Sequence, residues 1–203
     1  MVAMSDATGQ SEAFTSAMRS LEAAFLIGVP GTTELWLIRH ADCYEGMASH
    51  EDPPLSRLGR DQARRLGERV NRAGYDVVYT SPLRRAQETA TAISERVTTD
   101  ERLVEVSAEL ADGRVAVTEP PEQVLERMRA SVDDAVANHP GCRVIMVGHG
   151  VAIFQYLCSL LDLQFGSLRL FPYYTCVNVV RALGERRMVG SLADTAHLEA
   201  RDG

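Results

Sequence analysis

Three short apolar runs, each followed by polar or glycine residues and then by a helical pattern, constrain the fold of this chain most strongly. The runs are Leu35–Ile38, Val77–Tyr79 and Val144–Val147. Short, continuously apolar runs are typical of strands that are buried on both faces of a sheet. Because segments with helical spacing of apolar residues separate the runs, the sequence predicts an α/β fold with a largely parallel sheet.

The other segments complete this alternation. Residues 175–180 and 188–192 are expected to close the sheet, and Val104–Val106 is a possible short strand followed by a loop over 107–119. Helices are predicted at four places, judged by apolar spacing, caps and breaks. They begin at Ser56, at Ser81-Pro82, at Pro120-Pro121 and at Val151.

Residues 1–33 form an N-terminal extension ahead of a domain that spans 34–203. Phe14, Met18, Leu21 and Phe25 lie on one stripe of a predicted helix. Four such side chains are too many to leave in water, so we expect the helix to dock, first on its own domain or else on a second copy in a homodimer. It should lie away from the ligand pocket, because the Gly28–Thr33 break enters the first strand at its start.

Composition narrows the possible partners and chemistries. The net charge is −7, which disfavours nucleic acid and anionic membranes, so an anion must bind in a local cationic pocket. All 21 basic residues are Arg, which excludes Schiff-base chemistry and a P-loop lysine. The N-terminus has no basic start and no apolar core of a secretory signal, so we expect a cytoplasmic protein.

Chemically useful side chains follow each of the three apolar runs. The first run ends at Arg39-His40, the second leads to Arg84-Arg85, and the third ends at Gly148-His149. Since ligands bind beyond the carboxyl ends of strands in open α/β sheets, these groups are expected to converge. Guanidinium groups can clamp phosphoryl oxygens and an imidazole can attack phosphorus, so the set favours phosphoryl chemistry.

With these residues in place, the sequence resembles the histidine phosphatase superfamily, which contains cofactor-dependent phosphoglycerate mutases and many acid phosphatases. The resemblance covers about residues 34–198. The matching stretches are LWLIRHAD (35–42), DPPLSRLGRDQA (52–63), YTSPLRRAQETA (79–90), PEQVLERMR (121–129), VIMVGHG (144–150) and SLADTAHL (191–198).

The resemblance implies a three-layer α/β/α sandwich of the phosphoglycerate mutase type and a phosphomonoesterase that forms a phosphohistidine. It makes His40 the nucleophile, Arg39 and Arg85 the phosphate clamps, and His149 a second imidazole on the phosphoryl group. Arg84 is expected to face solvent. The substrate would be a small phosphate ester, and neither a metal nor another cofactor is required, because the cluster itself supplies positive charge.

The proton donor is less well defined, because the family's acid follows a short strand in a Leu-x-Glu pattern. Asp112 follows Leu110-Ala111 and comes after the possible strand at the expected separation in sequence. It is our first candidate. Glu105 fits the Leu-x-Glu pattern but would lie inside that strand. Glu109 is a third candidate.

The loop after the nucleophile departs from the family pattern. Ala41 replaces a usual Gly and Asp42 a usual Glu, while Cys43 and Gly46 stand where Ser or Thr and Asn are usual. We expect an adjusted loop geometry with the chemistry retained, and a substrate preference that differs from that of typical members.

Three other functions remain open. A phosphoglycerate mutase-type phosphotransferase is less favoured because mutases are longer, with segments that exclude water. A metal-dependent hydrolase could use His40, Asp42, His50 and His149. A catalytically silent phosphate-binding protein would fit the departures in the loop.

Overall fold

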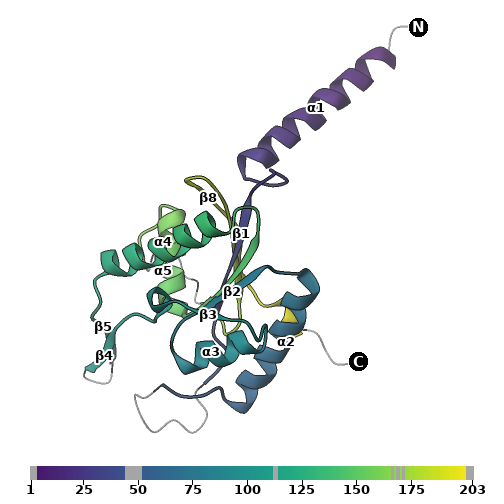
Figure 1. Cartoon of the computed structure of the whole chain (residues 1–203). Coiled ribbons are helices and arrows are strands. Elements are labelled where there is room, and N and C mark those ends of the chain that lie inside the picture. Colours follow the sequence, from purple (N-terminus) through teal and green to yellow (C-terminus); the bar gives the residue numbers. More distant parts are fainter. Residues whose placement is uncertain are drawn as a thin grey trace.

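The computed structural model describes residues 4–43, 52–111, 114–165, 167, 170 and 172–199, with the side chains of 4–13 and 108–116 left aside. Within these residues, six strands form the main sheet in the order β3-β2-β6-β1-β7-β8 (Figure 1). Their bounds are β1 (Thr33–Arg39), β2 (Val77–Thr80), β3 (Thr98–Thr99), β6 (Arg143–Gly148), β7 (Val177–Leu183) and β8 (Arg186–Asp194).

Helices cover both faces of this sheet, which confirms the three-layer α/β/α sandwich. Helices α2 (Arg57–Ala73) and α3 (Arg84–Thr91) lie on one side, and α4 (Pro121–Asn138) and α5 (Gly150–Leu160) lie on the other (Figure 1). A short α6 (Ala196–Glu199) packs near α2. None of the described helices is both long enough and apolar enough to cross a membrane.

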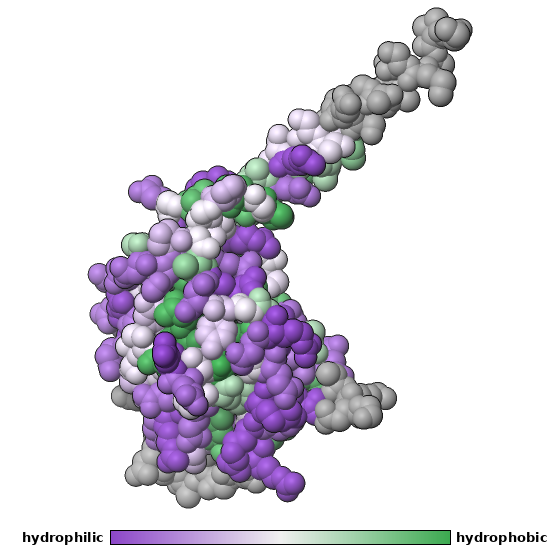
Figure 2. Space-filling view, turned by 45° about the vertical axis from the view of Figure 1, so that its right-hand side comes forward, coloured by the Kyte–Doolittle hydropathy of each residue, from purple (hydrophilic) through white to green (hydrophobic). Residues whose placement is uncertain are grey.

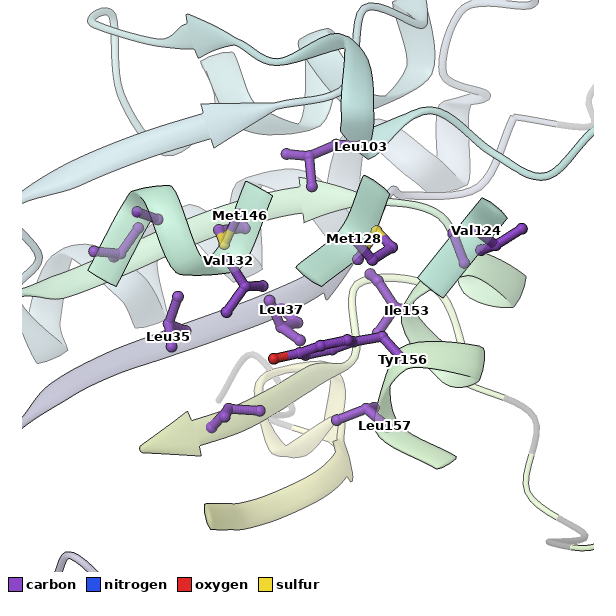
Figure 3. Close-up of a cluster of buried hydrophobic side chains, with 14 of the residues drawn as sticks. Leu35, Leu37, Leu103, Val124, Met128, Val132, Met146, Ile153, Tyr156 and Leu157 are labelled. Carbon is purple, nitrogen blue, oxygen red and sulfur yellow. The ribbon is translucent and has the colours of Figure 1, made fainter. Parts of the chain in front are cut away.

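The alternation of side chains along β1 explains why both faces of the sheet are covered. Leu35 and Leu37 enter the core under α4 and α5, where Met128, Val132 and Tyr156 meet them (Figure 3). Trp36 and Ile38 point the other way, into the core under α2 and α3. Successive strand residues face opposite sides, so a continuously apolar run requires two apolar layers.

The sheet is mostly parallel, as predicted. Strand β6 pairs in parallel with β1 on one side and with β2 on the other, and β2 pairs in parallel with β3. Strand β7 runs antiparallel to β1, and β8 runs antiparallel to β7. The carboxyl ends of β1, β2 and β6 therefore lie at one edge of the sheet.

The expected strand over Val104–Val106 is wrong. A 3₁₀ turn, η1 (Glu101–Leu103), precedes this segment, which then runs on without pairing as a strand. Its backbone oxygens are bound by a side chain instead, because Arg127 donates to the carbonyl groups of Arg102 and Val104, at 2.7 Å each.

The expected loop over 107–119 is also wrong. Strands β4 (Ala108–Ala111) and β5 (Arg114–Val117) pair there as an antiparallel two-stranded sheet, separate from the main one.

The first helix, α1 (Met4–Ala24), projects from the domain rather than docking on it (Figure 1). Phe14, Met18, Leu21 and Phe25 are between 40% and 68% exposed, so the expectation that they pack on their own domain is wrong. The reason lies in the connection: Leu26 is buried, and the backbone then turns through positive φ at Gly28 and Gly31. As expected, α1 leaves from the start of β1, at the opposite end from the residues after Arg39 (Figure 1).

The chain after β1 is fixed against the first turn of α2. Ser56 caps α2 through its Oγ, which accepts from the Gly59 backbone N–H at 2.9 Å. The Ser56 N–H donates to the Asp42 carbonyl oxygen, and the Asp42 N–H donates to Gln62. A Cβ on Gly59 would lie 1.9 Å from the Asp42 oxygen, so only glycine permits this approach.

We predict that Gly59→Ala lowers the free energy of unfolding by roughly 1–3 kcal/mol, because a methyl group must push α2 away from Asp42. Chemical denaturation measures this change. Leu58→Ala is the matched control, since Leu58 is 56% exposed and its loss should cost at most about 0.5 kcal/mol. Equal stability of Gly59→Ala and the parent chain would show that the close approach does not hold.

Candidate active site

Three strand ends bring the predicted residues together. The His40 N–H donates to the Gly148 carbonyl oxygen, and the Ser81 N–H donates to the Val147 carbonyl oxygen, both at 2.9 Å. Strand β6 therefore holds the end of β1 on one side and the end of β2 on the other. His149 follows β6 directly, so its ring lies beside that of His40, with 5.1 Å between the ring centroids.

His40 is buried, and one ring nitrogen is already engaged. Its Nδ1 lies 2.7 Å from the carbonyl oxygen of Ala41. A carbonyl oxygen only accepts hydrogen bonds, so Nδ1 carries the proton and Nε2 keeps its lone pair. Burial is the main cause that lowers the pKa of His40 to about 3, and the charges of Arg85 and Arg39 act in the same direction. The ring is therefore neutral at neutral pH, with Nε2 available as a nucleophile.

His149 is fully buried and is also neutral. Burial first, and then the neighbouring His40 and Arg85, hold its pKa well below the usual range. Its Nε2 shares a 2.8 Å hydrogen bond with the Ser81 hydroxyl group. Among the described residues, its Nδ1 has no hydrogen-bond partner. A buried polar atom of this kind is available to a ligand.

Arg39 is held by a segment far along the chain. Its Nη1 donates to the Pro172 carbonyl oxygen at 2.6 Å, and its guanidinium group lies 4.0 Å from the centre of the Tyr174 ring. The Thr175 N–H donates to the Arg39 carbonyl oxygen. Gly150 packs on the same guanidinium group, since a Cβ there would lie 3.2 Å from Arg39 Nε. These contacts fix the direction of a side chain that is 7% exposed.

Arg85 stands in the first turn of α3. Its Nη1 donates to Asp52 at 3.0 Å, and the same carboxylate accepts from the backbone N–H of Arg84. Its charge contributes to lowering the pKa of both His40 and His149. Arg84 instead pairs with Glu88 and is mostly exposed, as expected.

The Ala41 methyl group explains how this chain tolerates a departure from the family pattern. Ala41 is fully buried and packs with Leu55 and Ala63 in a small apolar cluster. Its backbone N–H donates to Thr89 Oγ1 at 3.0 Å. Ala41, directly after His40, is thus fixed by packing and by one hydrogen bond to α3.

Of the three candidate acids, only Glu105 has a described side chain. Asp112 lies outside the described residues, and the side chain of Glu109 is not described. Glu105 Oε1 accepts from the N–H groups of Val106 and Ala152, at 2.9 and 3.2 Å, while Oε2 has a single long contact of 3.5 Å to Val151. The Glu105 carboxylate therefore lies at the N-terminus of α5, the helix that begins directly after His149.

Other predicted residues are only partly described. His50 and Gly46 lie outside the described residues. Cys43 is buried, and this burial is the main reason why the pKa of its thiol is raised. The described part of the chain contains no group of three or more His, Cys, Asp or Glu side chains that could hold a metal ion.

Sequence reasoning missed three contributors to the site, Ser81, Thr89 and Tyr174. Ser81 was assigned to a helix start, but α3 begins only at Arg84, which leaves the Ser81 hydroxyl group to contact His149. Thr89 belongs to the Ala-x-x-Thr-Ala stretch that distinguished Arg85 from Arg84, so the sequence did contain a signal for Thr89. No sequence signal links Tyr174 to Arg39.

A buried pair of neutral imidazoles beside two guanidinium groups, at the carboxyl edge of an α/β sandwich, defines a phosphoryl-transfer enzyme. Residues 35–118 and 108–195 match the model of the Histidine phosphatase superfamily (branch 1). The chain belongs to this superfamily, and it is a phosphatase of the phosphoglycerate mutase-like type.

Similar proteins agree with this assignment. A probable phosphoglycerate mutase GpmB of Yersinia enterocolitica is 26% identical, over 82% of this chain and 95% of its own. Phosphoserine phosphatase 1 of Hydrogenobacter thermophilus is also 26% identical, over 81% and 94%. The solved structure of YhfR from Bacillus stearothermophilus superposes with a TM-score of 0.68 at 26% identity, covering 82% of this chain and 99% of YhfR.

We predict that the two buried histidines make stability depend on pH. The pKa of His40 is about 3 in the folded chain and about 6.5 when unfolded, so the unfolded state binds the proton more readily. Stability is full above pH 6.5 and falls as the pH drops below it, by roughly 2 kcal/mol for this histidine at pH 5.

Chemical denaturation at pH 7.5 and pH 5 measures this loss. His40→Asn should lose less stability than the parent chain between these two values, because the asparagine cannot take up a proton. An identical loss in both proteins would argue against a buried, neutral His40.

Proposed function

We propose that this chain hydrolyses small phosphate monoesters in two steps through His40. The observation that carries the proposal is the state of the His40 ring. The Ala41 carbonyl oxygen holds the proton on Nδ1, and the ring is neutral, so Nε2 has a free lone pair. In the first step Nε2 attacks phosphorus, a P–N bond forms, and the P–O bond to the leaving group breaks. In the second step water attacks phosphorus, the P–N bond breaks, and inorganic phosphate leaves.

The cationic groups stabilise the charge that these steps move. Arg39 and Arg85 would bind the phosphoryl oxygens, and the N–H of His149 would donate to one of them. The structure supports this by holding Arg39 rigidly between Pro172, Tyr174 and Gly150. Asp52 now binds Arg85, and a substrate phosphate would compete with that carboxylate for the same guanidinium group.

The acid protonates the leaving oxygen in the first step and takes a proton from water in the second. Asp112 stays a candidate. The argument against Glu105 was an expected strand over Val104–Val106, and this strand does not form. Since Glu105 lies beside the start of α5 with Oε2 only weakly engaged, we place it first among the three acids.

The substrate class follows from the pocket and from the relatives. A local cationic cluster in a chain of net charge −7 suits a small anion. Relatives carry the names phosphoserine phosphatase and phosphoglycerate mutase, so phosphoserine and phosphoglycerates are the first esters to test. The net charge gives no support for nucleic acid or an anionic membrane as a partner, and we keep the cytoplasm as the expected location.

A mutase is the second candidate, supported by the similarity to probable phosphoglycerate mutases. Incubation with a phosphoglycerate separates the two functions. A phosphatase releases inorganic phosphate, whereas a mutase yields the isomeric phosphoglycerate without loss of phosphate.

We predict that the chain hydrolyses an aryl phosphate without added metal, that vanadate inhibits it, and that His40→Asn lowers kcat by at least roughly 10³-fold. His139→Asn is the matched control, because His139 ends α4 and binds Tyr79 outside the pocket. A phosphorylated protein trapped by acid quench should be absent in His40→Asn. Activity abolished by a chelator would favour the metal-dependent hydrolase, and bound phosphate without turnover on any ester would favour a silent binding protein.

We predict that Glu105→Gln slows hydrolysis of an alkyl phosphate roughly 10²–10⁴-fold but changes aryl phosphate hydrolysis little, because only a poor leaving group needs a proton. Asp112→Asn is measured beside it. If Asp112→Asn gives the selective loss and Glu105→Gln does not, the role passes to Asp112.

A further inference from the structure

Helix α1 and the residue directly after it present four large apolar side chains to water. Phe14, Met18, Leu21 and Phe25 are 68%, 40%, 52% and 51% exposed. The part of α1 nearest the domain accordingly shows hydrophobic surface (Figure 2). Most of the stability of a helix in a protein comes from the packing of an apolar face, and these side chains have no such packing on their own domain.

The spacing of these residues indicates what kind of partner fits. They are separated by four, three and four positions. At 3.6 residues per turn Phe14, Met18 and Leu21 fall within an arc of about 60°, and Phe25 continues the spacing directly after α1 ends. A helix that docks on a globular core has a wider apolar face, of about 100° or more, whereas a narrow stripe is typical of a coiled-coil seam.

We propose that α1 pairs with α1 of a second copy of this chain, in antiparallel orientation. The four-three-four spacing reads the same in both directions, so the seam is complementary to itself about a twofold axis between Met18 and Leu21. Phe14 then lies opposite Phe25 of the partner subunit, and Met18 lies opposite Leu21 of the partner subunit.

The residues beside the seam suit this arrangement. Ala17 and Ala24 flank it on one side and are small, so the two helices can approach closely. On the other side Glu22 would face Thr15 of the partner subunit, so no like charges oppose each other.

The domain itself favours the antiparallel orientation. Leu26 is buried in the domain directly after the seam ends at Phe25. A parallel pair would bring both domains to the same end of the seam, where they would compete for the same space. An antiparallel pair sends them to opposite ends.

A membrane surface is the competing occupant. Interfacial helices carry a polar face rich in Lys and Arg. The segment Met4–Ala24 contains Asp6, Glu12 and Glu22 against a single Arg19, so its polar face repels anionic lipid.

The proposal is independent of the proposed catalytic chemistry, since α1 precedes the start of β1 and His40 follows its end (Figure 1). Sedimentation of the full chain over a range of concentrations should show a reversible dimer. Leu21→Glu should raise its dissociation constant at least roughly tenfold, because a carboxylate would be buried in the seam. Ser20→Glu, which adds the same charge outside the seam, should change it less than about twofold.

Two results would overturn the pairing. One is a wild-type chain that stays monomeric at every concentration, and the other is a dimer that Leu21→Glu leaves intact. Binding of the monomer to anionic vesicles would assign the stripe to a membrane instead. Circular dichroism should show that Leu21→Glu keeps its fold, because Leu21 is exposed in the single chain.

Disulfide cross-linking tests the orientation, with the oxidised wild-type chain as the control for the native cysteines. Phe14→Cys mixed with Phe25→Cys should cross-link efficiently, while either variant alone should not. Cross-linking of each variant alone would show a parallel pair and overturn the antiparallel arrangement.

Discussion

The pairing of β6 with both β1 and β2 is the constraint on which the site depends. Two backbone hydrogen bonds, from His40 to Gly148 and from Ser81 to Val147, hold the ends of three strands together at one edge of the sheet. The same strands bury apolar side chains on both faces, so the forces that build the core also set the distance between the two imidazole rings. Moving β1 relative to β6 would separate His40 from His149.

Burial also determines the charge of the two histidines. Two histidines lie deep in the protein beside two arginines, and taking a cation out of water is costly. The histidines respond by staying neutral, and a neutral ring is the state that the proposed nucleophile requires. Asp52 and the Tyr174 ring lie against the guanidinium groups of Arg85 and Arg39.

The layered fold and the convergence of Arg39, His40 and His149 were predictable because they follow from local patterns, whereas the choice of Arg85 over Arg84 came from the family resemblance. Apolar runs define buried strands, and the ends of parallel strands meet at one edge. The sequence analysis did not predict the β4–β5 pair. The dipeptide Asp112-Gly113 between two strand-like stretches is nevertheless a strong signal for a hairpin. The contact of Arg39 with Pro172 and Tyr174 joins residues more than 130 positions apart, and nothing in the local sequence specifies such a contact.

In the reaction proposed for His40, the hydrogen bond between His40 Nδ1 and the Ala41 carbonyl oxygen bears on the lifetime of the phosphoenzyme. That oxygen would keep the proton on Nδ1 after phosphorylation of Nε2, so the ring of the intermediate would be a cation. When water attacks phosphorus, the ring departs as a neutral imidazole, which is a far better leaving group than an imidazolate anion. A backbone carbonyl group also places no full negative charge behind the ring, so the cationic intermediate gains little stabilisation from it. One neutral acceptor thus both orients the nucleophile and shortens the life of the covalent state.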